Sequence, residues 1–143
     1  MTKKKRTFFV VYKEISNLCG KSKPVSAELW AEAHSLAKTF RDFTNGHSFA
    51  RHDDPKWGEK FLDGMAKTAE KPAEWEWVCN SSAPLSGHWS LGVSKLLEIA
   101  EQKNSLPVWK KLRAILPKDH KLSPEIRAKI SEHGKKHQTA NEA

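Results

Sequence analysis

The stretch SAELWAEAHSLAKTFRDFTNG, residues 26–46, carries the clearest structural pattern in the chain. Its apolar residues recur at alternating steps of four and three, which is the spacing of the buried face of an amphipathic α-helix. Ser26 is a favourable N-cap, and the pair Asn45-Gly46 favours a helix end. We therefore expect one central helix over residues 26–46. Its predicted core residues are Leu29, Leu36, Phe40 and Phe43.

Helical spacing also recurs on both sides of this stretch, bounded by capping residues, prolines and glycines. Only residues 72–80 are ambiguous, because Trp75, Trp77 and Cys79 alternate as in a β-strand. Helix is favoured there because no other segment offers a strand partner. The pattern predicts an all-α fold, an irregular or orthogonal bundle of six or seven helices without significant sheet. The expected helices cover residues 7–20, 26–46, 55–70, 72–80, 88–103, 105–116 and 123–134.

The length of 143 residues fits one domain with a sizeable core. We expect that domain over residues 7–134, preceded by a flexible basic arm at residues 1–6 and followed by a disordered polar tail at residues 135–143. No apolar run approaches the length of a membrane span, and the start of the chain lacks a signal-peptide pattern. The two cysteines are therefore expected to be reduced thiols in an intracellular, cytoplasmic protein.

The net charge of +8 is concentrated at the two ends of the chain. Residues 1–24 carry seven Lys or Arg against one Glu, and residues 103–137 carry ten against three acidic residues. Residues 25–102 are mildly acidic, with eight basic against twelve acidic residues. This distribution indicates a polyanionic partner, and the backbone of RNA or DNA is the first candidate.

Basic residues near the C-terminus flank apolar positions, so helices there can hold a core on one side and present cations on the other. Such a surface binds phosphates by charge without reading bases. Base-specific recognition by a helix-turn-helix is disfavoured, because the loop KDHKLSP is longer than the usual turn. The predicted nucleic-acid-binding residues are Lys110, Lys111, Arg113, Lys118, Lys121, Arg127 and Lys129, together with Lys3, Lys4, Lys5 and Arg6 of the arm.

Six tryptophans are many for a chain of this length. Trp57 and Trp89 lie on apolar stripes and are expected in the core. Trp75, Trp77 and Trp109 are the candidates for an interface, because an exposed indole is suited to protein contacts or base stacking.

Residues 41–47, with Arg41 followed by Asp42 and six residues on by His47, resemble the short signature of HEPN-type ribonucleases. In that family an arginine and a histidine form a metal-independent RNA-cleaving site, usually across a dimer. The resemblance implies that His47 moves the proton of the 2′-hydroxyl and that Arg41 stabilises the charge of the phosphorane. Because Asn45-Gly46 is expected to end the helix before His47, the ribonuclease stands as an alternative to a non-catalytic protein.

No pair of histidines or cysteines has the spacing of a zinc site, and no glycine-rich phosphate loop is present, so we expect no metal and no cofactor. The expected function is binding of the nucleic-acid backbone, without catalysis, as a subunit among other protein subunits of a nucleoprotein complex. Small helical basic subunits of RNA-guided CRISPR effector complexes are similar in physical profile, as an analogy of class only. A protein-only adaptor or inhibitor that binds an acidic protein surface is a further alternative.

Overall fold

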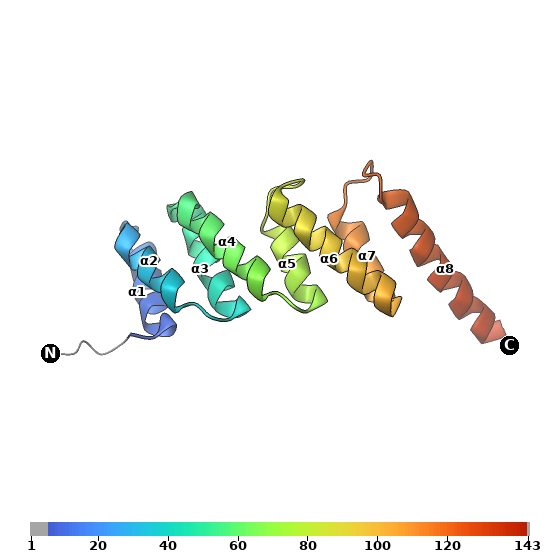
Figure 1. Cartoon of the computed structure of the whole chain (residues 1–143), viewed down its shortest axis with the longest axis horizontal. Helices are drawn as coiled ribbons and strands as arrows, with labels where there is room; N and C mark the ends of the chain where they lie inside the picture. The colour runs from blue at the N-terminus through green and yellow to red at the C-terminus, as the bar shows by residue number, and fades with distance from the viewer. Residues whose placement is uncertain (1–5, 143) are drawn as a thin grey trace. The chain divides into compact units, whose positions relative to one another are not determined.

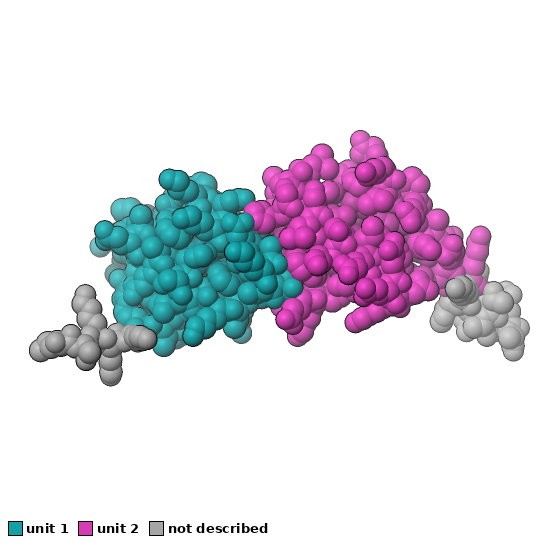
Figure 2. Space-filling model, in the orientation of Figure 1, with its two compact units in different colours: residues 1–69 teal, residues 70–143 magenta. Residues whose placement is uncertain are grey.

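The computed structural model describes the backbone of residues 6–142 and the side chains of residues 6–135, and this part of the chain is all-α (Figure 1). Eight helices are present there, one or two more than the sequence predicts. The chain divides into two compact units, residues 1–69 (unit 1) and residues 70–143 (unit 2), shown in two colours in Figure 2. The helices are α1 (Phe8–Gly20), α2 (Ala27–Leu36), α3 (Phe40–Asp53) and α4 (Pro55–Thr68) in unit 1, and α5 (Pro72–Asn80), α6 (Gly87–Lys103), α7 (Leu106–Ile115) and α8 (Ser123–Glu142) in unit 2.

The central helix predicted over residues 26–46 is wrong, because the chain breaks into α2 and α3 at residues 37–39. Ala37 and Thr39 have extended backbones, and Thr39 caps α3 by accepting a hydrogen bond from the backbone N–H of Asp42 at 3.1 Å. The Asp42 carboxylate in turn accepts from the backbone N–H of Thr39 at 3.3 Å. This reciprocal capping box starts a new helix. Its sequence signal, Thr39 followed three residues later by an acid, lies inside the predicted helix.

The predicted helix end at Asn45-Gly46 is also wrong, because Gly46 is a buried interior residue of α3. The missing side chain makes room for Phe61 of α4, whose ring occupies the space that a Cβ at Gly46 would take. Gly64 of α4 has the same relation to Phe43 of α3. Each helix therefore places an aromatic ring against a glycine of the other, and this close packing outweighs the weak helix propensity of glycine.

The buried residues of unit 1 differ from the predicted core because the predicted helix is broken. Trp30 and Ala33 of α2 are buried, whereas the predicted core residues Leu29, Leu36, Phe40 and Phe43 are half-buried. The inward face of α2 is therefore rotated relative to the predicted stripe. The buried residues of this core are Val11, Ile15, Val25, Trp30, Ala33, Ala50 and Phe61.

Unit 2 is built from α5 to α8, with α6 packed against α5 and α7, and α7 packed against α8 (Figure 1). The ambiguous segment at residues 72–80 is helical, as predicted, with Trp75, Val78 and Cys79 buried. Asn104 ends α6 in the left-handed conformation, which agrees with the predicted helix end.

The expectation of a single domain over residues 7–134 stays a prediction beside the two compact units. Helix α8 extends to Glu142 in the backbone, and the disordered tail predicted at residues 135–143 likewise stays a prediction. Among the described helices, none is both long enough and apolar enough to cross a bilayer.

Candidate nucleic-acid interface

Helix α7 separates an apolar face from a basic one. Val108, Trp109 and Leu112 are buried, at 4%, 1% and 0% exposure, and hold the helix against unit 2. Lys110 and Arg113 lie on the exposed side. Because they are three residues apart, their side chains are neighbours on one face of the helix. The two cations therefore project from the solvent side of α7, as the sequence predicts.

Lys111 lies between these two cations but has a different environment. Its side chain is half-buried, and its Nζ donates to Glu76 Oε1 of α5 at 3.2 Å. This ion pair ties α7 to α5 inside unit 2. A phosphate at Lys111 would have to compete with the Glu76 carboxylate, so Lys111 is the weakest member of the predicted set on this helix.

The loop between α7 and α8 carries Lys118 and Lys121, both exposed. It is closed by the buried hydroxyl of Ser123, which donates to the carbonyl of Pro117 at 2.7 Å. Within it, the backbone N–H of Leu122 donates to His120 Nδ1 at 3.1 Å. These internal hydrogen bonds hold the two lysines on a defined turn between the helices.

Helix α8 completes the basic surface. Ile126 is buried at 1% exposure and anchors the helix, while Arg127 is exposed and its Nε donates to the carbonyl of Ser123 at 3.4 Å. Lys129 is half-buried. We define the basic surface as Lys110, Arg113, Lys118, Lys121, Arg127 and Lys129. Among the side chains that the structure describes, none of these six has an ion-pair partner, although the acidic residues Asp119 and Glu125 lie on the same segments.

Among the predicted N-terminal cations, Arg6 lies in the described part of unit 1. Lys3, Lys4 and Lys5 lie outside the described residues. Arg6 is engaged within unit 1, where its Nη1 donates to Glu14 Oε2 at 2.6 Å and its Nε donates to Glu32 Oε2 at 3.1 Å. These carboxylates raise the pKa of the Arg6 guanidinium further above its ordinary value. Arg6 is thus held by two acidic residues of the same unit.

Of the three tryptophans predicted at an interface, Trp77 alone is exposed, at 55%. Trp75 and Trp109 are buried at 5% and 1% exposure. The indole N–H of Trp109 donates to Asn104 Oδ1 at 3.4 Å, so its polar edge is satisfied within unit 2. An interface role among these three is therefore left to Trp77. The core expectation is confirmed for Trp89, which is buried, while Trp57 is half-buried against the core of unit 1.

Arg41 and His47 lie on one helix, α3, but their side chains do not converge. Six residues along an α-helix correspond to a rotation of about 600°, which places the two side chains on different faces. Arg41 is exposed, whereas His47 is buried at 6% exposure. Burial, and then the positive charges of Arg51 and His52, lower the pKa of His47 below its ordinary value. Within one chain the two residues therefore do not form a common site.

The depressed pKa of His47 predicts that unit 1 loses stability in mild acid. The unfolded chain takes up a proton near the ordinary histidine pKa of about 6.5, whereas the folded chain resists it until a lower pH. The free energy of unfolding should therefore fall as the pH drops through about 6.5 and be insensitive to this group above it. Urea denaturation at several pH values measures the slope, and His47→Gln should flatten it. His52→Gln, at an exposed residue of the same helix, removes only the smallest of the three causes of the shift and should flatten the slope much less. An unchanged slope in His47→Gln would contradict the assignment.

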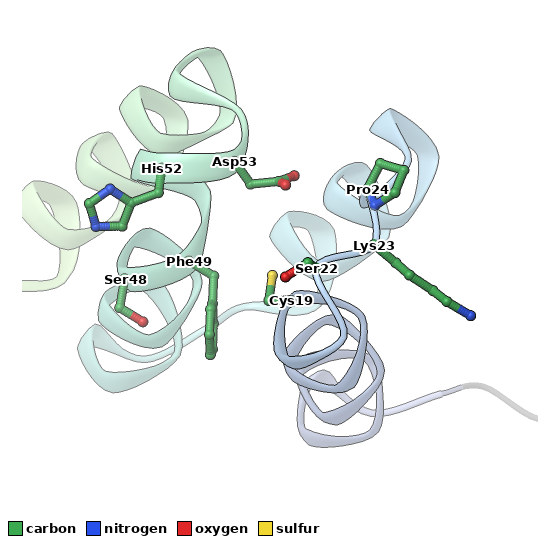
Figure 3. A pocket seen from close by; sticks show the side chains of 8 residues that line it. All are labelled: Cys19, Ser22, Lys23, Pro24, Ser48, Phe49, His52 and Asp53. Atoms are coloured by element: carbon green, nitrogen blue, oxygen red, sulfur yellow. The ribbon is translucent and has the colours of Figure 1, made fainter.

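Unit 1 has a pocket of about 460 Å³ near the end of α3, shown in Figure 3. It contains a cysteine, a histidine and an aspartate, the residue types of a thiol nucleophile site. However, the imidazole of His52 points away from the sulfur of Cys19 in Figure 3, and burial raises the pKa of the Cys19 thiol. A thiol with a raised pKa and an imidazole that points away from it both count against nucleophilic chemistry at Cys19. The pocket is lined by Cys19, Ser22, Lys23, Pro24, Ser48, Phe49, His52 and Asp53.

The sequence-based predictions missed the exposed apolar residues of α1. Phe9 is 63% exposed and Val10 is 48% exposed. Both residues are apolar but lie outside the apolar stripe that runs through Val11 and Ile15. Apolar residues outside the stripe are the signal that a count of helical periodicity can detect.

Comparisons of the chain with protein-family models, with curated proteins and with solved structures returned no match.

Proposed function

We propose that the chain binds nucleic acid through phosphates, with the basic surface of α7, the following loop and α8, as a non-catalytic subunit of a larger nucleoprotein assembly. The single observation that supports this most is the exposure of Lys110, Arg113 and Arg127 on helices whose other sides are buried. Cations held on a fixed scaffold, with no ion-pair partner among the described side chains, are suited to track a phosphate backbone. The exposed indole of Trp77 supports contact with other protein subunits.

Charge reversal at three residues tests this proposal. The variant Lys110→Glu, Arg113→Glu and Arg127→Glu is expected to weaken binding of a labelled oligonucleotide on the order of 10²-fold at about 0.1 M salt, because each phosphate contact adds about 0.9 to the salt slope. Lys111 is left unchanged, since a second carboxylate beside Glu76 would destabilise unit 2. Fluorescence anisotropy measures the affinity, and circular dichroism verifies the fold.

A matched control variant carries the same change in net charge elsewhere. Lys56→Glu, Lys67→Glu and Lys95→Glu alter three exposed lysines outside the basic surface, and this variant should lose much less affinity. Equal losses in both variants would mean that net charge alone attracts the oligonucleotide and would overturn the proposed surface.

The affinity for a polyglutamate peptide of similar charge is the third measurement. If the peptide binds as tightly as the oligonucleotide, the adaptor that binds an acidic protein replaces the nucleic-acid proposal.

A further inference from the structure

Unit 1 holds a second pocket of about 470 Å³ between α1 and α3. This volume falls within the range of about 300–1,000 Å³ that is typical of small-molecule sites. Aromatic residues come from α1 and polar residues come from α3. The lining residues are Phe8, Phe9, Tyr12, Arg41, Asp42 and Asn45.

The α1 side of the pocket consists of aromatic rings. Phe8 and Tyr12 are stacked, with ring centroids 5.9 Å apart and an interplanar angle of 17°. Phe9 is the most exposed aromatic residue among them, and Lys13 Nζ lies 5.5 Å from the centroid of its ring. Exposed aromatic rings accompanied by cations are the platforms on which unpaired bases stack.

The α3 side supplies polar groups of matching chemistry. Arg41 is exposed, and a guanidinium binds phosphate in a bidentate manner and also stacks on aromatic planes. Asn45 offers an amide with both donor and acceptor groups, which suits the edge of a base. The acidic residue, Asp42, is engaged with the chain itself, because its carboxylate accepts from the backbone N–H groups of Lys38 and Thr39 at 3.1 and 3.3 Å. The pocket therefore combines apolar rings with a cation whose charge is not compensated by an ion pair among the described side chains.

We propose that this pocket binds an unpaired nucleobase with its phosphate at Arg41, so that unit 1 selects single-stranded over double-stranded nucleic acid. The inference rests on the proposed function for the class of ligand. A duplex hides the faces of its bases and cannot place one against Phe9, whereas the basic surface of unit 2 accepts either form. Nucleic acid is favoured over an apolar protein segment because two exposed cations accompany the rings, Lys13 at the ring of Phe9 and Arg41 in the lining of the pocket.

Two oligonucleotides, a single strand of about 15 nucleotides and the duplex of the same sequence, test the pocket in the full-length protein. Phe9→Ala is expected to weaken binding of the single strand about 5- to 150-fold and to leave duplex binding unchanged. Arg41→Gln should also act on the single strand alone. Val10→Ala, an exposed apolar neighbour that does not line the pocket, is the matched control and should bind as the wild type does. Equal affinity of Phe9→Ala and wild type for the single strand would overturn the inference.

The lone tyrosine of the chain gives a direct readout, because Tyr12 lines this pocket. Protein labelled with fluorotyrosine should give one fluorine NMR signal that shifts with the single strand and with the mononucleotide AMP, but not with the duplex. A saturable shift with AMP in a protein that binds neither oligonucleotide would support the pocket and refute the proposed function. Loss of oligonucleotide binding on charge reversal in unit 2, with no fluorine shift for any ligand, would support the proposed function and refute the pocket.

Discussion

Trp30→Ala is expected to lower the free energy of unfolding of unit 1 by about 3–5 kcal/mol. Trp30 has no exposed surface, and its ring meets Phe61 edge to face at a centroid distance of 6.0 Å. Its indole N–H donates to Asp53 Oδ2 at the end of α3, at 3.2 Å. The side chain thus joins α2 to both α3 and α4, and its removal leaves a large cavity among helices whose packing is close. Chemical denaturation followed by far-UV circular dichroism measures the effect.

Two further variants separate the causes of this loss. Asp53→Ala removes the acceptor of the indole hydrogen bond, but Asp53 is exposed, so we expect a cost of only about 0.5–1.5 kcal/mol. Trp77→Ala removes a tryptophan that is mostly exposed and should change stability by no more than about 0.5 kcal/mol. If Asp53→Ala were as costly as Trp30→Ala, the hydrogen bond would be the main contribution and the burial argument would be wrong.

Separate unfolding transitions of the two units in Trp30→Ala would contradict the single domain predicted over residues 7–134.

Local signals in the sequence were sufficient for most helices. Proline at the first turn, as in α4, α5 and α7, and Asn104 after α6 mark boundaries that depend on the backbone alone. The all-α class followed from these signals and from the apolar spacing, and the structure confirms it. The separation of exposed Lys110 and Arg113 from buried Leu112 on α7 was predictable for the same reason, because it depends on helical geometry within one segment.

Features that depend on contacts between helices could not be predicted from periodicity. The step from Leu36 to Phe40 has helical spacing, yet the helix breaks between them and the capping box of Thr39 and Asp42 starts α3. Gly46 lies inside a helix, where the ring of Phe61 packs in the space that a Cβ at this position would occupy. Trp109 is buried although it lies beside two lysines in the sequence. At Gly46 and Trp109 the packing against other helices decides between local alternatives, whereas the break at Thr39 is decided by the local capping box.

The two candidate sites differ in the same way, because one is built from neighbouring segments of the chain and the other from distant ones. The basic surface of unit 2 arises from consecutive segments, so its members were named from the sequence, except that the pairing of Lys111 with Glu76 across 35 residues was hidden. The pocket of unit 1 joins the first two turns of α1 to the first two turns of α3, and these helices begin more than thirty residues apart. Arg41 was singled out for its spacing from His47, and the structure places it instead with the rings of α1.

The affinity of the wild type for an oligonucleotide is expected to fall about 10³-fold when the salt concentration rises from about 50 to 200 mM. The basic surface offers six cations, and if each neutralises one phosphate of a duplex, the logarithm of the association constant falls with a slope of about −5 against the logarithm of the salt concentration. Counterion release is the cause, because the bound cations replace ions condensed on the nucleic acid. Anisotropy titrations at four or more salt concentrations measure this slope. A slope near −1 would contradict binding through the six residues.

The ion pair of Lys111 supplies a variant that should strengthen binding. Glu76→Gln removes the carboxylate that holds Lys111 Nζ at 3.2 Å and frees this lysine beside Lys110. The salt dependence of the association constant should then steepen, by up to about 0.9 in slope, and the affinity at low salt should rise. Charge reversal at Lys110, Arg113 and Arg127 should instead reduce the slope by about 2.7. Glu98→Gln, at an exposed acid of α6, makes the same change in net charge and should leave the slope unaltered. Opposite shifts in slope from neighbouring residues, with no shift from the control, follow only if phosphates lie on this face of α7. An equal gain from both glutamine variants would instead assign the effect to net charge.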